Sequence, residues 1–272
     1  MKIRQNTPAA LERSKARTAP LAGIMCESNK PKVNILDIAP SADVKMVFPV
    51  KRKPTTSRHE FVAYWFAHHM PFTIAAMAGR GRGYIGTVFK GAPDNGGGWD
   101  GFAQMFLADP LRHPPEGFGA RPVDSFQERV EPYFGWATRE YVVESGADHL
   151  FVRPLTLGLP FPTSRSGFFK VVVFVPPQAD ADHGSFQSRW LTERAPGIAD
   201  ALRQVDGFRY VVSLSLEPET APYSGMEELY FHDESAWRRF QALVGADDMA
   251  WWGAGEGPQT FFSDTEFVAI PV

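Results

Sequence analysis

Short apolar runs alternate with segments of helical periodicity along the first half of the chain. The runs have the length and the β-branched or aromatic content of buried strands. They cover residues 44–50, 84–89, 99–107 and 136–144. After the first run, Phe61, Trp65 and His69 recur at the four-residue spacing of one helix face. Pro71 predicts that this helix bends or restarts, because proline has no backbone N–H to donate.

Two further signals complete the first half. Ser57 and Glu60 have the spacing of a capping box, in which two side chains satisfy the first backbone N–H groups of a helix. Residues 123–130 predict a weaker second helix. The first half therefore has the predicted order strand–helix–strand–strand–helix–strand, which is the ferredoxin-like order.

The second half has the same predicted order of elements. Its strands are expected at residues 169–175, 208–216, 225–231 and within 259–270. Its helices are expected at residues 185–203 and 234–244. Pro196 interrupts the longer helix, as Pro71 interrupts its counterpart. Two ferredoxin-like repeats in one chain predict that their sheets pack face to face, as the sheets of two subunits do in a dimer.

Individual residues also match between the halves, which indicates a tandem duplication. The helix pattern recurs 125 residues later, with the pairs Phe61 and Phe186, Trp65 and Trp190, His69 and Arg194, and Pro71 and Pro196. Strand positions match at offsets of 124 to 126 residues, with the pairs Lys45 and Lys170, Gln104 and Glu228, and Glu140 and Glu266. We therefore expect an arm at 1–42, a first domain at 43–149, a Pro-rich linker at 150–167 and a second domain at 168–272.

Three of these features together resemble the EthD family of the dimeric α+β barrel superfamily. They are a strand beginning with lysine, a helix with the pattern F-x-x-x-W-x-x-x-H-x-P, and a hairpin strand Gly-Met-Glu-Glu228-Leu-Tyr-Phe. The resemblance covers about residues 43–145 and 168–271. It implies an intramolecular α+β barrel with a cavity between sheet and helices. Superfamily relatives include cofactor-independent cyclases, dehydratases, decarboxylases and small monooxygenases, and some branches bind haem, so the fold does not give the reaction.

The positions at which the two halves differ are the candidate catalytic residues. A histidine can pass protons at neutral pH and an arginine cannot, so His69 is expected to act as general acid and base. Arg194 is expected to pair with Glu228 or to hold an anionic group of the substrate. The alternatives are structural, because His69 could be a core histidine and Glu228 could belong to a salt bridge.

A second set of polar and aromatic residues is expected to bind substrate. It comprises Tyr64, Trp65, His68, Arg82, Gln104, Trp190 and Tyr230. The two tryptophans could instead be packing anchors, His68 a solvent-facing helix-end residue, and Arg82 a loop cap. The adjacent pair Trp251 and Trp252 is either a lid over a second pocket or an exposed contact patch.

The composition limits the classes of partner that the protein is expected to bind. A net charge of -3 and a pI near 6.2 do not favour binding to nucleic acid or to an anionic membrane. The lone cysteine, Cys26, cannot form an internal disulfide, and no apolar run approaches the roughly 20 residues of a membrane span. We expect a cytoplasmic protein with no cofactor and no metal site, whose partner is a small hydrophobic or aromatic molecule. A homodimer of the two-repeat chain is an open alternative.

The leading functional hypothesis is a cofactor-independent lyase. It would dehydrate, decarboxylate or cyclise a small aromatic or polyketide-like molecule, with His69 moving the proton. One alternative is an oxygenase, either cofactor-free or haem-dependent. The other is a protein that binds or stabilises a small molecule without catalysis.

Overall fold

The computed structural model describes residues 38–91, 98–112, 114–150, 162–177, 182–245, 251–252 and 257–272. Most of the predicted arm, including Cys26, and most of the predicted linker lie outside these residues. The strands are β1 (Pro40–Val50), β2 (Gly81–Val88), β3 (Gly101–Leu107), β4 (Trp136–Glu144), β5 (Thr163–Arg165), β6 (Phe169–Val175), β7 (Gly207–Ser215), β8 (Gly225–Phe231), β9 (Gln259–Ser263) and β10 (Thr265–Ile270). The α-helices are α1 (Arg58–Tyr64), α2 (Met70–Ala76), α3 (His183–Arg189), α4 (Ala195–Gln204) and α5 (Glu234–Val244).

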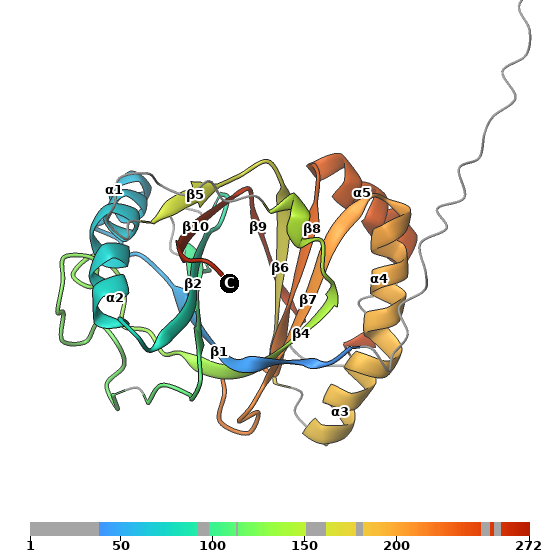
Figure 1. Ribbon diagram of the computed structural model, residues 1–272, viewed down its shortest axis with the longest axis horizontal. Helices are drawn as coiled ribbons and strands as arrows, with labels where there is room; N and C mark the ends of the chain where they lie inside the picture. Colours follow the sequence, from blue (N-terminus) through green and yellow to red (C-terminus); the bar gives the residue numbers. More distant parts are fainter. Residues whose placement is uncertain are drawn as a thin grey trace, which may run out of the picture. The chain divides into compact units, whose positions relative to one another are not determined.

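The strands form one antiparallel sheet that closes into a barrel. Their order is β5-β10-β2-β3-β1-β4-β7-β8-β6-β9. Only Asp264 separates β9, which is the last strand of this order, from β10, which is the second, so the chain passes directly between the two sides on which the barrel closes. Helices α1 and α2 cover the barrel on one side, and α3 to α5 cover it on the opposite side (Figure 1). This arrangement confirms the predicted α+β fold of two tandem ferredoxin-like repeats.

The two repeats exchange strands at both places where a strand of one repeat pairs with a strand of the other. β4 of the first repeat pairs with β7, and its Val143 packs in the hydrophobic core of the second repeat. β10 of the second repeat pairs with β2, and its Phe267 packs in the core of the first repeat. Each core is therefore completed by a strand from the other half of the sequence.

The long helix of each repeat contains one wide turn at the same place. Residues Trp65–His69 form a π-helical turn between α1 and α2, in which the Met70 N–H donates to the Trp65 carbonyl. In the second repeat, Trp190–Arg194 forms the matching turn between α3 and α4. A proline follows each turn. The predicted irregularity is thus a local widening of a continuous helix, and such π-turns occur frequently at functional sites.

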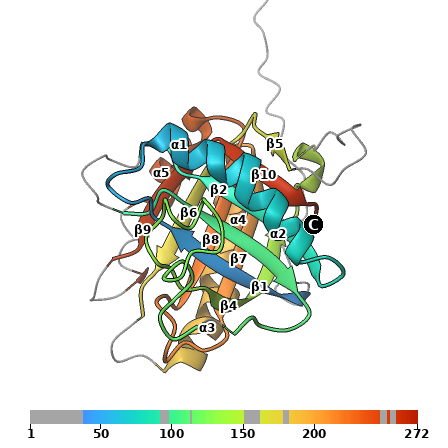
Figure 2. The same cartoon turned by 90° about the vertical axis from the view of Figure 1, so that its left-hand side faces the viewer.

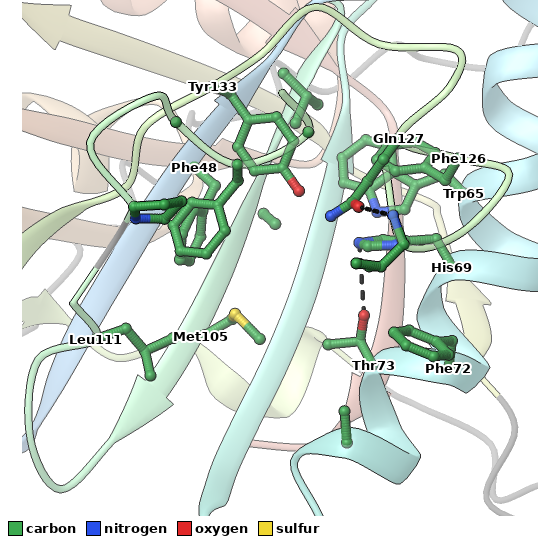
Figure 3. Close-up of a pocket in the computed structure, with 18 of the residues that line it drawn as sticks. Phe48, Trp65, His69, Phe72, Thr73, Met105, Leu111, Phe126, Gln127 and Tyr133 are labelled. Carbon is green, nitrogen blue, oxygen red and sulfur yellow. Dashed lines mark hydrogen bonds between the residues drawn. The ribbon is translucent and has the colours of Figure 1, made fainter. Parts of the chain in front are cut away.

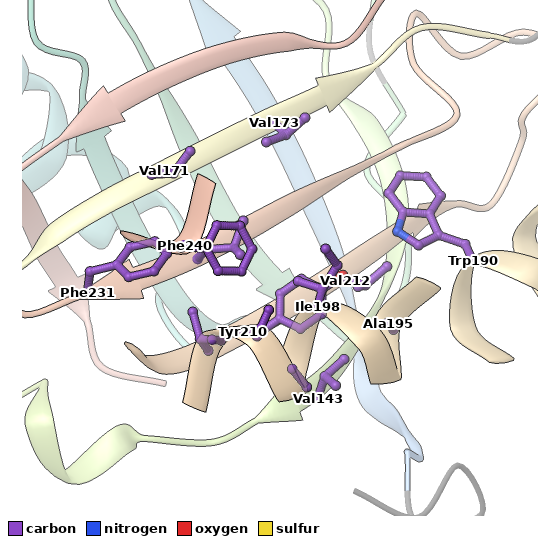
Figure 4. Close-up of a cluster of buried hydrophobic side chains, with 14 of the residues drawn as sticks. Val143, Val171, Val173, Trp190, Ala195, Ile198, Tyr210, Val212, Phe231 and Phe240 are labelled. Carbon is purple, nitrogen blue, oxygen red and sulfur yellow. The ribbon is translucent and has the colours of Figure 1, made fainter. Parts of the chain in front are cut away.

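Each tryptophan of the repeated pattern packs on a glycine of the sheet. A Cβ atom added at Gly101 would lie 2.9 Å from the Trp65 ring, and one added at Gly225 would lie 3.2 Å from the Trp190 ring. Glycine at these two positions lets the indole rings lie against the strands. Trp190 belongs to the second core, between α4 and the strands (Figure 4). Both tryptophans therefore pack against the sheet.

The predicted helix at 123–130 is wrong, because this segment forms successive turns. Backbone groups at the end of this segment bond to the chain just after β1 instead of within a helix. The Lys53 N–H donates to the Arg129 carbonyl, and the Glu131 N–H donates to the Lys51 carbonyl. Pro132 also disfavours helical geometry at the residue before it. The segment is therefore held along the chain that leaves β1.

The barrel interior holds a buried network of charged side chains. Lys45 pairs with Glu140 at 2.9 Å, and its counterpart Lys170 pairs with Glu266 at 2.6 Å. Glu228 lies between the two lysines, 2.7 Å from Lys170 and in contact with Lys45. Burial alone would raise the pKa of the Glu228 carboxyl, but the charges of Lys170 and Lys45 outweigh it and hold the pKa well below its usual value.

Candidate functional site

A cavity of about 470 Å³ lies between α1–α2 and the outer face of the first-repeat sheet. This volume is within the range of small-molecule sites. Helices α1 and α2 lie across the strands that form the floor (Figure 2). The floor comprises Phe48, Val50, Tyr84, Ala103 and Met105, and the helical wall comprises Trp65, His69, Phe72, Thr73, Ala76 and Met77. The segment between β3 and β4 supplies the remaining wall.

Exposed apolar side chains lie around this cavity. Phe72, Leu111 and Val123 are 49%, 40% and 67% exposed, and all three line it. Phe72 and Leu111 are labelled in Figure 3. Large apolar side chains seldom gather in this way on a surface without a binding role. The cavity is therefore suited to a hydrophobic ligand.

His69 is the main titratable group of the helical wall. Its Nδ1 lies 2.7 Å from Asp124 Oδ2, and the side chains of both residues are 12% exposed. Its ring stacks on Phe126, with the ring centroids 4.4 Å apart. Because a carboxylate partner accepts the Nδ1 hydrogen of a neutral imidazole, Nε2 is the basic atom. The dyad therefore presents a base in the cavity.

Backbone N–H groups fix the orientation of Asp124. Its Oδ1 accepts from the N–H groups of Phe126 and Gln127 at 2.9 and 3.1 Å, which leaves Oδ2 for His69. Burial raises the pKa of the Asp124 carboxyl, but the hydrogen bond and charge of His69, together with these N–H groups, lower it overall. Asp124 therefore stays ionised at neutral pH and would stabilise an imidazolium on His69.

A chain of hydroxyl groups continues from His69 toward the floor. The Thr73 hydroxyl lies 3.5 Å from His69 Nε2 and also bonds to the Tyr84 side chain. The Tyr84 hydroxyl in turn accepts from Trp65 Nε1 at 3.3 Å. Burial raises the pKa of Tyr84, so this phenol remains protonated. The Thr73 hydroxyl thus lies between the basic nitrogen of His69 and the neutral phenol of Tyr84.

The corresponding space in the second repeat is filled by side chains. Arg194, at the position of His69, bonds to Glu227 through Nε and Nη2 at 3.0 and 3.1 Å. Trp190 and Tyr210 donate to the same carboxylate. The Arg194 guanidinium lies over the Trp252 ring at 4.1 Å. Trp252 is thus buried against Arg194, which is neither of the two roles expected for it.

Two of the predicted site residues line the cavity, namely His69 and Trp65. Arg194 pairs with Glu227, so the predicted pair with Glu228 is wrong. The reason is that successive strand residues face opposite sides of a sheet. Glu227 faces the helices, whereas Glu228 faces the barrel interior, where it accepts from Gln104 at 2.6 Å.

The other predicted substrate-binding residues also lie away from the cavity. Tyr230 donates to Glu266 inside the barrel. Tyr64 stacks on His68 and lies under the Arg129 guanidinium, and neither ring is among the cavity walls. Arg82 is exposed and pairs with Asp43 at 2.6 Å.

Sequence reasoning missed Asp124, Tyr84, Gln127 and Tyr133. Asp124 and Gln127 lie in the segment wrongly predicted as a helix. Asp followed by glutamine three residues later is a helix-start signal, and here the carboxylate does accept the two N–H groups that a cap would satisfy. The same signal could have marked Asp124 as a fixed carboxylate near His69.

Two negative results concern the described residues alone. Across these ranges, no group of three or more His, Cys, Asp and Glu side chains is arranged to hold a metal ion. No helix in the part of the chain that the structure covers is long and apolar enough to cross a membrane.

Comparisons with known proteins support the fold. No protein-family model matches the sequence, and no curated protein matches it. An anthrone oxidase-like protein of known structure is 17% identical, with a TM-score of 0.53 over 84% of this chain and 94% of that chain. A chlorite dismutase mutant from Candidatus Nitrospira defluvii is 8% identical, with a TM-score of 0.46 over 85% and 93%.

A candidate monooxygenase from Lactobacillus acidophilus is 9% identical, with a TM-score of 0.45 over 83% of this chain and 94% of that chain. At these identities the likeness is one of fold, and the first of the three structures carries it. The chain therefore has the α+β barrel fold that two ferredoxin-like subunits form in a dimer, and here two repeats of one polypeptide take the places of the two subunits. Membership of the EthD family is not shown by any of these comparisons.

Proposed function

We propose that the protein is an enzyme that removes a proton from a small aromatic ligand in the first-repeat cavity and lets O₂ oxidise the resulting anion without a cofactor. The observation that carries this proposal is the His69–Asp124 dyad in an aromatic cavity. Asp124 holds the Nδ1 hydrogen, so Nε2 can accept the proton. The fold shared with an anthrone oxidase-like protein favours oxidation, and the EthD resemblance is compatible with it.

The reaction balances with O₂ as the only co-reactant. His69 Nε2 takes one proton of a ring methylene that is conjugated through an aromatic ring with a ketone, and the electron pair moves through that ring onto the ketone oxygen. The carbanion carbon then bonds to O₂. The second hydrogen leaves the carbon as a proton and goes to the distal oxygen as the O–O bond breaks, which gives a new carbonyl and hydroxide. His69 returns its proton to that hydroxide, which leaves as water.

The test is oxygen uptake with anthrone as the probe. Wild-type protein should consume one O₂ per anthrone oxidised, and His69→Gln should lower the rate about 10²- to 10⁴-fold, the usual contribution of general acid–base catalysis. His232→Gln is the matched control, because His232 packs against Phe208 and His149 and is not among the cavity walls. Equal rates in wild type and His69→Gln would refute the proposal, and a Soret band in the purified protein would refute its cofactor-free form.

A lyase is the second candidate, because the same dyad could start a dehydration, decarboxylation or cyclisation. Anaerobic assays separate the two functions. A lyase keeps its rate without O₂, whereas the proposed oxidation stops. A purely binding protein would keep the same ligand affinity in His69→Gln and process neither class of compound.

A further inference from the structure

Tyr133 carries a hydroxyl group on the wall of the cavity, and its neighbour determines in which direction that hydroxyl can donate a hydrogen bond. It lies in the segment just before β4, and its side chain is buried. The Gln127 side chain lies beside this hydroxyl (Figure 3), and its Oε1 atom already accepts from the Val123 N–H at 2.8 Å. The amide nitrogen of Gln127 is therefore the atom that faces the Tyr133 hydroxyl (Figure 3).

This arrangement leaves the Tyr133 hydrogen for a ligand. An amide nitrogen can only donate, so the Tyr133 hydroxyl can face it only as an acceptor, and its own hydrogen points elsewhere. Burial raises the pKa of Tyr133 to about 12, even though the Gln127 side chain lowers it, so the phenol keeps its hydrogen at neutral pH. The cavity wall thus carries, besides the base His69, a neutral phenol whose hydrogen is directed away from Gln127.

We propose that Tyr133 donates a hydrogen bond to a negatively charged ligand oxygen, so that the cavity binds aromatic ketones as their enolates and phenols as their phenolates. This inference rests on the proposed function for the site and for the direction of proton transfer. A donor placed where charge develops stabilises the anion more than the neutral ligand. It also defines the substrate class as aromatic carbonyl compounds that can ionise.

The charges around Tyr133 are compatible with an anion. Besides Tyr133, the titratable groups among the described residues that line the cavity are His69, Tyr84, Glu116 and Arg121, and Asp124 lies behind His69. Glu116 and Arg121 pair with each other at 3.1 Å. When the ligand's proton moves to His69, the imidazolium balances Asp124. The anion then meets no net negative charge.

Binding of 4-nitrophenol tests the inference without turnover. The phenolate absorbs at longer wavelength than the phenol, so a titration below the solution pKa of the probe reports both affinity and ionisation of the bound molecule. Wild-type protein should bind the anion. Tyr133→Phe should weaken this binding about 10- to 100-fold, as expected for a hydrogen bond to a charged group. Affinity for 4-nitroanisole, which cannot ionise, should not change.

Two further variants keep the test decisive. Tyr64→Phe is the matched control, because Tyr64 stacks on His68 outside the cavity, and it should bind as wild type. Gln127→Glu keeps an acceptor for the Val123 N–H but presents a carboxylate to Tyr133. This carboxylate would accept the hydrogen bond of the phenol and leave no donor for the ligand. It should lose phenolate binding even if Tyr133→Phe fails to fold. Unchanged phenolate affinity in folded Tyr133→Phe or Gln127→Glu protein, or binding of 4-nitrophenol in its neutral form, would overturn the inference.

The outcome is separable from that of the proposed function. If anthrone oxidation proceeds equally in His69→Gln, the proposed function fails whatever the phenolate titration shows. If His69→Gln loses oxidation while Tyr133→Phe keeps full phenolate affinity, only the role of Tyr133 fails.

Discussion

Replacing Glu228 by glutamine should destabilise the protein more than any surface charge change. The network around Glu228 contains three cations and three carboxylates, so it carries no net charge. Its members are Lys45, Lys170, Arg165, Glu140, Glu228 and Glu266. The substitution leaves one uncompensated positive charge among side chains that are almost fully buried. Breaking a buried ion pair in this way typically costs about 3–5 kcal/mol of unfolding free energy.

The assay is urea unfolding at neutral pH, with wild type and variant compared by circular dichroism. Glu234→Gln is the control, since the Glu234–Arg238 pair is exposed and should contribute less than about 1 kcal/mol. Adding Lys170→Met to Glu228→Gln should recover part of the loss, because two neutral pairs then remain, Lys45 with Glu140 and Arg165 with Glu266.

Acid should erase the difference between wild type and Glu228→Gln. The pKa of Glu228 is depressed in the folded state, so its contribution to stability is complete above the ordinary carboxyl value of 4.5 and is lost as the pH falls below it. A loss below about 1 kcal/mol at neutral pH, or a loss that does not shrink below pH 4.5, would refute this account of the network.

Three other predictions concern the two repeats. Asp124→Asn should lower turnover on anthrone while ligand affinity, measured by calorimetry, stays within about threefold, since the asparagine keeps the bonds to the backbone but loses the charge; unchanged turnover would contradict it. Ala103→Leu should weaken ligand binding at least about tenfold without lowering the melting temperature, because the larger side chain can extend into the cavity. Unchanged affinity would place the ligand elsewhere. Trp252→Ala should cost about 3–5 kcal/mol in urea unfolding, whereas Phe72→Ala, at an exposed position, should cost far less; equal losses would contradict the filled second site.

The repeat offsets made the fold predictable, because they report matching contacts. Lys45 and Lys170 match because each pairs with a carboxylate inside the barrel, and Gly101 and Gly225 match because a tryptophan lies on each. The site residues were harder to predict from the sequence than the fold. The usual inference that a polar strand residue faces solvent fails where both faces of a sheet are buried.

Glu227 and Glu228 show why the assignment failed. Both are buried, so the alternation of polar and apolar residues did not indicate which one faces the helix. Asp124 was missed for a different reason. It belongs to a segment whose conformation depends on backbone bonds to residues 51–53, far away in the sequence. Local propensity cannot predict such contacts.

The exchange of β10 has a consequence for synthesis on the ribosome. β2 is translated long before β10, so its outer edge lacks a partner while the second repeat is still being made. An unpaired strand edge is a template for association with other chains. The first repeat, with the cavity it carries, thus reaches its final form only after the second repeat has emerged, and truncated nascent chains should be the species most prone to aggregate.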